Sequence, residues 1–217
     1  MLIIYGSEVS SPSNKVRFMA NLAGVEYEYR SIHLAKGEAR TPEFMKKHPA
    51  GKVPVIDDNG FVLFESNAIL KYLARKYRPE LYPSGIEEQA LVDQWMDFVS
   101  AHVGQAMAKI TFNRLLAPLR EIEVDQRSLD EGVKFMHRFL PPVENFLEAS
   151  EDSYFFGRAI SIVDVNLLAT LDPAEAAGVD LSPYEKLSRW RNRLKQEEFY
   201  IRCHRSYEET LQKYAGK

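Results

Sequence analysis

The feature that most constrains this chain is a change of pattern between residues 78 and 86. Before this segment, short apolar strand-like stretches alternate with helical ones, whereas every long stretch after it has helical periodicity. The segment itself is turn-rich, with prolines at 79 and 83 and a glycine at 85. We therefore predict an α+β fold of two domains, residues 1–77 and 87–217, joined by a linker at 78–86.

Within the first 77 residues the pattern predicts strand, helix, strand, a loop with a short helix, a hairpin and a final helix. Asn59-Gly60, between two apolar runs, is the strongest short hairpin signal. The predicted strands cover 2–5, 26–32, 53–56 and 61–64, and the two longer helices cover 12–23 and 66–77.

The back half reads as helices throughout. We predict one long helix at 87–116 that ends near Pro118, and another at 126–149 that is kinked or interrupted at Pro141-Pro142. The remaining predicted helices cover 161–171, 183–195 and 197–214.

Composition excludes several classes of function. The 217 residues carry a formal net charge of −3 and no basic block, so nucleic-acid binding has no electrostatic support. No apolar run approaches the length of a membrane span, and residues 1–5 are too short for a signal peptide. Cys203 is the only cysteine, and the five histidines lack ligand spacing. We expect a cytoplasmic protein without disulfide, metal or membrane partner.

Three segments of the front half contain candidate binding residues. In Ser10-Ser11-Pro12-Ser13, proline favours the first helical position, so we expect Ser11 to be the N-cap and Ser10 to face a ligand. The alternative is that these serines only cap the helix and bind no ligand. In the segment 50–55, Pro54 interrupts an apparent strand; the interruption is sensible if Val53-Pro54 is cis, although a strand-initiating proline is the commoner case.

The third segment, 65–69, pairs Glu65 with Ser66, a natural N-cap. A carboxylate next to a helix N-terminus suits an α-amino acid, which carries both charges, and a plain cap is the alternative. In the back half, Ser161 and Asp164 have the spacing of a capping box, with Ile160 as its hydrophobic staple. We interpret that box as structural.

Together these motifs resemble the cytosolic glutathione transferase superfamily, most closely its theta, delta and phi-like branches. Residues 10–17 are similar to the family's S-x-P-x-x-x-V segment, and 36–44 to the phi segment G-E-H-K-x-P-x-F. Residues 48–54 are similar to the N/H-P-x-G-K/Q-V-P motif, and 161–164 and 178–184 to the helical domain. The similarity covers the whole chain and implies a thioredoxin-like domain followed by an all-helical one.

The resemblance also implies a role for each site position. Ser10 donates its hydroxyl to the sulfur of glutathione, with Ser11 and Ser13 as alternatives for that hydroxyl. Val53, before a cis Pro54, pairs its backbone with the cysteinyl unit, and Glu65 and Ser66 hold the γ-glutamyl ammonium and carboxylate. The implied contacts to the rest of the peptide are Arg40 and Lys52. Ala39 stands where the phi segment has histidine, which leaves the glycine end to Arg40.

The implied function is a detoxifying glutathione transferase, a homodimer whose co-substrate is glutathione and which needs no cofactor. Its second substrate is a small hydrophobic electrophile, for which we name a tentative pocket: Val9, Met107, Ile110, Thr111, Arg114 and Leu115. A glutathione-dependent disulfide reductase needs a thiolate at the first helix, where this chain has Ser10. The remaining alternative is a transferase-like binding or interaction module without turnover.

Overall fold

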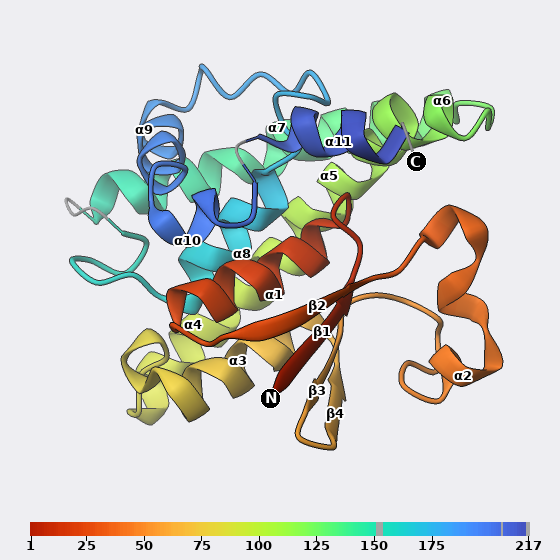
Figure 1. The fold of residues 1–217 in the computed structure, drawn as a ribbon. Helices are drawn as coiled ribbons and strands as arrows, with labels where there is room; N and C mark the ends of the chain where they lie inside the picture. The colour runs from red at the N-terminus through yellow and green to blue at the C-terminus, as the bar shows by residue number, and fades with distance from the viewer. Residues whose placement is uncertain (151–153, 205, 216–217) are drawn as a thin grey trace. The chain divides into compact units, whose positions relative to one another are not determined.

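The computed structural model describes residues 1–150, 154–204 and 206–215, and it divides the chain into two compact units. One unit comprises Met1–Tyr82 together with Glu198–Lys217, and the other comprises Pro83–Glu197. Figure 1 labels their helices and strands. In the described ranges, no helix is both long and apolar enough to cross a membrane. The division into domains 1–77 and 87–217 stays a prediction.

The first unit contains a four-stranded mixed sheet. Its strands are β1 (Leu2–Gly6), β2 (Tyr27–Ser31), β3 (Val55–Asp58) and β4 (Phe61–Phe64), in the order β2-β1-β3-β4. β1 is parallel to β2, and β3 is antiparallel to both β1 and β4. This is the thioredoxin-like arrangement that the resemblance implied.

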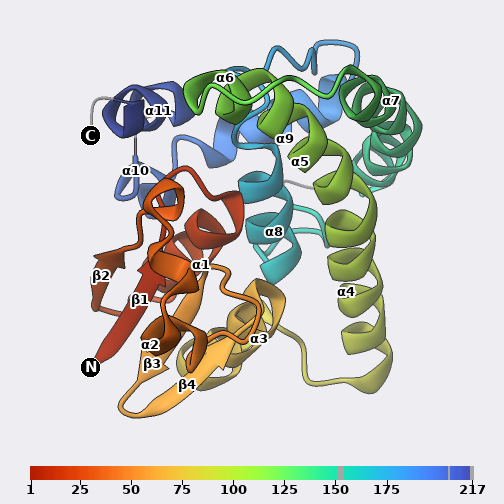
Figure 2. The ribbon, with the colours of Figure 1, turned by 90° about the vertical axis from the view of Figure 1, so that its right-hand side faces the viewer.

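Helices cover both faces of this sheet. On one face α1 (Ser11–Leu22) packs beside α3 (Ser66–Tyr77), and the short α2 (Pro42–Met45) lies on the other face (Figures 1 and 2). Alternation along the strands divides the buried side chains between the faces. Tyr5 and Val55 form a cluster with Phe44 of α2, while the register pair Ile4 and Ile56 is fully buried on the opposite face.

The β3–β4 hairpin confirms the Asn59-Gly60 signal. Both residues have positive φ, 54° and 93°, as the favoured two-residue turn requires. The predicted strand 53–56 begins two residues later than expected, at Val55, and runs on to Asp58. Because Pro54 has no N–H to donate, the ladder starts only after it.

The second unit is all-helical, as predicted. Its long helical run consists of α4 (Ile86–Phe98), α5 (Gly104–Thr111) and α6 (Ala117–Leu119), joined by π-helical turns at Val99–Val103 and Phe112–Leu116. α7 (Gln126–Ala149) continues through Pro141 and Pro142, so the expectation of an interruption there is wrong, whereas the alternative of a kink stays a prediction. Its buried positions on both sides of the prolines, among them Met136 and Leu147, stabilise the helix by packing. α8 (Ile162–Leu171) and α9 (Glu185–Leu194) complete the unit.

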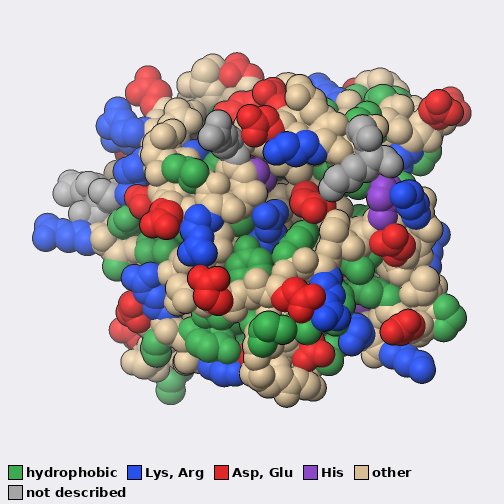
Figure 3. All heavy atoms as spheres, in the orientation of Figure 1, with side chains coloured by type: hydrophobic (Ala, Val, Ile, Leu, Met, Phe, Trp, Pro, Cys, Tyr) green, Lys and Arg blue, Asp and Glu red, His purple; other side chains and the backbone are tan. Residues whose placement is uncertain are grey.

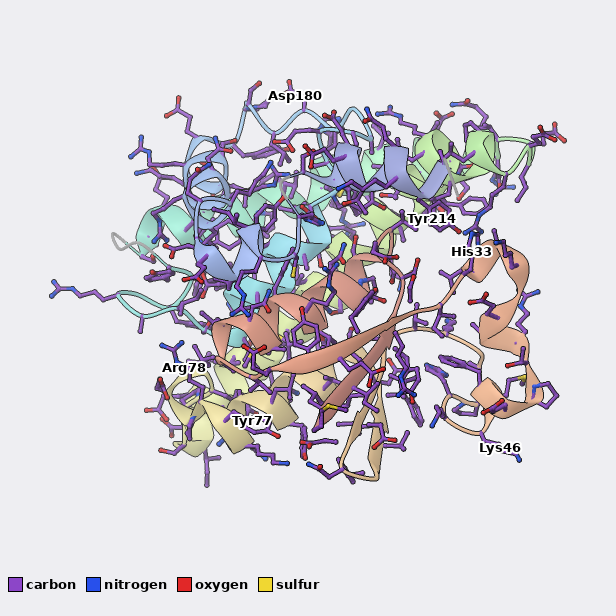
Figure 4. All side chains as sticks on the ribbon, viewed as in Figure 1. His33, Lys46, Tyr77, Arg78, Asp180 and Tyr214 are labelled. Carbon is purple, nitrogen blue, oxygen red and sulfur yellow. The ribbon has the colours of Figure 1, made fainter. Side chains whose placement is uncertain are left out.

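The C-terminal segment belongs to the first unit. The single helix predicted at 197–214 is instead α10 (Glu198–Ile201) and α11 (Tyr207–Ala215); residue 205 of that span lies outside the described residues. The side-chain amide of Asn21 donates to the Phe199 carbonyl at 3.0 Å, and the Tyr207 hydroxyl donates to the Val9 carbonyl at 2.7 Å. The Tyr214 ring lies against His33, with centroids 5.2 Å apart (Figure 4).

Candidate functional site

The strand register brings three segments of the predicted site to one edge of the sheet. Val55, the first residue of β3, pairs with Tyr5 near the end of β1 and with Phe64 at the end of β4. Three stretches of chain therefore lie next to one another at this edge (Figure 1). They are the stretch that leaves β1 towards α1, the stretch that enters β3 and the stretch that leaves β4 towards α3. These are the segments that carry Ser10, Val53-Pro54 and Glu65-Ser66.

Ser10, and not Ser11 as expected, is the N-cap of α1. Its backbone is extended and its carbonyl accepts the first helical bond, from the Asn14 amide at 2.9 Å. Its Oγ accepts a long hydrogen bond of 3.4 Å from the Ser13 amide. Accepting this bond uses a lone pair, so the hydroxyl hydrogen of the half-buried Ser10 remains available to another acceptor.

The neighbouring serines differ from Ser10. The Ser13 side chain is fully buried, and its Oγ accepts from the Ser7 amide at 3.2 Å. Ser11 is the first helical residue and is half-buried. Of the three hydroxyls considered for the sulfur, that of Ser13 lies inside the unit, whereas Ser10 and Ser11 keep access to solvent.

The Val53-Pro54 peptide bond is cis. Pro54 is buried, and the half-buried Val53 packs against the cluster of Tyr5, Phe44 and Val55. The ladders of β3 begin at Val55, so the backbone of Val53 lies just outside them. A peptide in extended conformation can pair with such a strand end.

Glu65 occupies the N-cap position of α3, which we had expected for Ser66. It has φ 67° and ψ 108°, an uncommon conformation for a non-glycine residue, and its exposed side chain makes no capping bond. The first-turn amide of Ser66 has no acceptor within the helix. An exposed carboxylate thus lies directly beside an anion-attracting helix N-terminus.

Lys15 connects the two helix N-termini. Its side chain is buried, at 5% exposure, and its Nζ donates to Ser66 Oγ at 3.1 Å and to Asn67 Oδ1 at 2.8 Å. Burial lowers the pKa of Lys15 from 10.5 to about 7, an effect that the nearby Glu65 carboxylate partly offsets. A buried cation therefore lies directly behind the start of α3.

The loop before α2 packs against the chain that enters β3. A Cβ added to Gly51 would lie 2.8 Å from the Ala39 carbonyl and 3.6 Å from Cγ of Arg40. Arg40 and Lys52, both exposed, thus belong to touching segments. Ala39, which replaces the phi-type histidine, is 3% exposed and packs in the cluster with Tyr5.

Comparison with known proteins identifies the family. A model of the glutathione S-transferase N-terminal domain matches residues 2–75, and one of the C-terminal domain matches residues 91–198. The chain is 34% identical over 164 residues to glutathione S-transferase 1 of Zea mays, which covers 75% of this chain and 76% of that protein. It is 32% identical over 168 residues to glutathione S-transferase F10 of Arabidopsis thaliana, with 76% and 77% covered. The chain belongs to the glutathione S-transferase family.

Comparison with solved structures supports the same family. Glutathione S-transferase-I bound with lactoylglutathione superposes with a TM-score of 0.81 at 28% identity, over 99% of this chain and 98% of that one. The glutathione S-transferase family binds glutathione, so the sheet edge described above is the candidate glutathione site of this chain.

The residues that we predicted to line the electrophile pocket lie in both units of this family member. Val9 is buried in the first unit, where its carbonyl accepts from Tyr207. The others lie on one helical run of the second unit: Met107, Ile110 and Thr111 are buried, Leu115 is half-buried, and Arg114 is exposed. Arg114 donates to the carbonyls of Ala177 and Gly178 at 2.7 and 2.9 Å, which is a structural use of its guanidinium. Their role in binding an electrophile stays a prediction.

Other kinds of site have less support in this glutathione S-transferase chain. Among the described residues, no group of three His, Cys, Asp or Glu side chains could hold a metal ion. A cavity of about 60 Å³ beside Ile110 and Arg114 is too small for an organic substrate. On the face drawn in Figure 3, acidic and basic side chains are interspersed, with no basic stripe.

Sequence reasoning missed Lys15, although it lies within the quoted 10–17 segment. The available signal was its position four residues before Met19, on the same face of α1 as the buried stripe. A lysine on a buried helical face needs partners, and Ser66 and Asn67 supply them.

Proposed function

We propose that this chain is a glutathione transferase, in which Ser10 activates the thiol of glutathione for attack on a hydrophobic electrophile. Glu65 would bind the γ-glutamyl ammonium, and Ser66 with the first amide of α3 would bind the γ-glutamyl carboxylate. The backbone of Val53 would pair with the cysteinyl unit, and Arg40 and Lys52 would contact the glycyl end. The thiolate forms a carbon–sulfur bond with the electrophile, where it either displaces a leaving group that departs with its bonding pair or adds to an activated double bond whose electron pair is then protonated from solvent. The proton lost from the thiol leaves to solvent.

The observation that carries this proposal is the convergence of Ser10, Val53 and Glu65 at one sheet edge. The strand order β1-β3-β4 supports the assignment, because the groups proposed for the sulfur, the cysteinyl backbone and the γ-glutamyl unit follow these strands in that order. A structural relative, glutathione S-transferase-I, was solved bound with the ligand lactoylglutathione, which supports the same ligand class.

The chemistry required of Ser10 is modest. A free thiol has a pKa near 8.5, so only about 3% is thiolate at pH 7. A hydrogen bond to the charged sulfur is worth about 1.5–3 kcal/mol, which corresponds to a pKa lowered by roughly one to two units. The N-terminus of α1 favours the anion further. Ser10 fits this role because its hydroxyl hydrogen is available while its lone pair caps the helix.

The test is to measure kcat/KM for glutathione as a function of pH, with a broadly reactive electrophile as second substrate, and to determine the midpoint of that pH profile. We expect Ser10→Ala to raise the midpoint by about a unit or more, while glutathione affinity changes by only a few fold. Ser11→Ala is the matched control and should leave the midpoint in place. If Ser11→Ala or Ser13→Ala moved the midpoint and Ser10→Ala did not, the activating hydroxyl would belong to that neighbour. Glutathione binding without turnover of any electrophile would support a binding module instead.

A further inference from the structure

The environment of Lys15 is unusual for a lysine. Its ammonium is buried between two neutral acceptors, Ser66 Oγ and Asn67 Oδ1, both at the start of α3. In the described part of the chain, its Nζ has no carboxylate within ion-pair distance. An isolated buried charge is costly, so such a group is normally paired. Ser66 itself is half-buried, so its side chain keeps access to solvent.

The hydrogen bond from Lys15 also fixes the orientation of the Ser66 hydroxyl. Because an ammonium can only donate, Ser66 Oγ must accept from it through a lone pair. The Ser66 hydrogen then points to a different acceptor. The Ser66 amide, a first-turn amide of α3 that has no acceptor within the helix, lies at the same place. Hydroxyl and amide together form a set of donors suited to a carboxylate.

We infer that Lys15 is a positioning residue for the γ-glutamyl carboxylate of glutathione. Its ammonium holds the Ser66 hydroxyl in the donating orientation and provides positive charge one hydrogen bond behind it. Glu65, on the exposed side, then serves the γ-glutamyl ammonium. This inference rests on the proposed function and adds to it a residue that contacts no substrate atom.

Binding of the γ-glutamyl carboxylate should then depend on pH. With the pKa of Lys15 lowered by burial to about 7, the neutral and charged forms of Lys15 coexist in the free protein near neutral pH. Among the titratable groups on neighbouring elements, the Glu65 carboxylate acts on Lys15, whereas Arg17 of α1 faces Cys203 and Tyr29. A bound carboxylate raises the pKa of Lys15, so binding takes up a proton. Affinity should be constant well below pH 7 and fall as the pH rises above it.

The experiment is calorimetric titration with S-methylglutathione in two buffers of different ionisation enthalpy at pH 7.5. This ligand has no ionisable thiol, so Ser10 chemistry does not contribute to proton exchange. We expect the wild type to take up on the order of half a proton on binding. Lys15→Met should abolish this uptake and weaken binding about tenfold or more at pH 6.5. Lys15→Arg should bind within a few fold of wild type, without proton uptake and without loss of affinity up to pH 8.5.

Two further variants separate positioning from a structural role. Lys46→Met, at the exposed end of α2 on the far side of the sheet from α1, should behave as wild type (Figure 4). In a Ser66→Ala background, Lys15→Met should have much less effect than in the wild type, because the hydroxyl that it positions is gone.

The outcomes are distinct. No measurable binding of S-methylglutathione to the wild type overturns the proposed function, and this inference with it. Binding with equal proton uptake in wild type and Lys15→Met, or with unchanged affinity in that variant, overturns the inference alone. If Lys15→Met does not fold, the comparison of wild type with Lys15→Arg decides: equal proton uptake in these two proteins rejects a role for Lys15.

Discussion

At the scale of single residues, the start of α1 shows how one side chain can serve stability and chemistry together. Ser10 accepts from the Ser13 amide and keeps its own hydrogen for a ligand. Its hydrogen-bonding capacity therefore need not be divided between the helix and the sulfur. Ser11, in contrast, is inside the helix and has no capping function.

This arrangement predicts which serine stabilises the fold. Ser10→Ala should lower the free energy of unfolding by about 1 kcal/mol, the usual value of an N-cap, reduced somewhat by the long 3.4 Å bond. Ser11→Ala should change it by less than about 0.5 kcal/mol, since alanine is a good helix former. Urea unfolding of both variants provides the measurement. If Ser11→Ala lowered the free energy of unfolding more than Ser10→Ala, Ser11 would be the N-cap, as expected from the sequence.

Glu65 is the residue that we expect to determine glutathione affinity. Glu65→Ala removes the ion-pair partner of the γ-glutamyl ammonium, far from the sulfur, and should weaken binding by about 1.5–3 kcal/mol while kcat changes little. Glu80→Ala, which removes another exposed carboxylate of the same unit, is the control. Calorimetry that finds equal affinity for wild type and Glu65→Ala would place the γ-glutamyl group elsewhere.

The segments that carry the candidate site residues could be named from the sequence, whereas the exact places of those residues at the helix starts could not. Serine is a good cap at either 10 or 11, and proline is tolerated at either of the first two helical positions, because neither needs its N–H. Composition alone therefore does not choose between the two caps. The backbone of Glu65 at φ 67° has no sequence signal, because non-glycine residues adopt it only where the surrounding structure imposes it.

At the scale of elements, the helices of the second unit were predictable from periodicity. The exceptions have physical causes. α7 continues through two prolines because its buried stripe compensates for the lost hydrogen bonds, and local rules do not include that packing. The last predicted helix is two helices, α10 and α11, of which α10 packs on α1 of the first unit. That contact depends on long-range packing, which periodicity does not report.

The capping box of α8 is the element whose loss we expect to cost most. The Asp164 carboxylate is fully buried and accepts from the amides of Phe155 and Ser161, from Ser161 Oγ and from the Trp190 indole, all at 2.8–2.9 Å. Asp164→Asn replaces one accepting oxygen by a donor, which leaves buried donors facing it. The free energy of unfolding should fall by about 3 kcal/mol or more.

The control for that experiment is Asp180→Asn. Asp180 is exposed and accepts hydrogen bonds from Ser182, that from the backbone amide at 2.9 Å. It should lower the free energy of unfolding by less than about 1 kcal/mol, as is usual at the surface. Similar losses from the two variants, measured by urea unfolding, would show that the box is not a centre of stability.

At the scale of the whole molecule, β4 of the first unit is an edge strand with exposed apolar side chains. Phe61 is 50% exposed, and Val62 and Phe64 are each 37% exposed. Exposed apolar edge strands invite association, and proteins normally cover them. In a family member whose candidate glutathione site lies at the end of this same strand, a second copy of the chain is the covering that we propose.

We therefore predict a homodimer. Sedimentation at micromolar concentration should give twice the 24.9 kDa of one chain. Phe61→Glu should shift the protein towards the monomer, because it places a charge in an apolar contact. Ile122→Glu is the matched control, since Ile122 is similarly exposed at 46% but belongs to the second unit and not to the sheet. Circular dichroism should show both variants folded. A wild type that sediments as one chain, or a dimer that Phe61→Glu leaves intact, would mean that β4 is not the dimer surface.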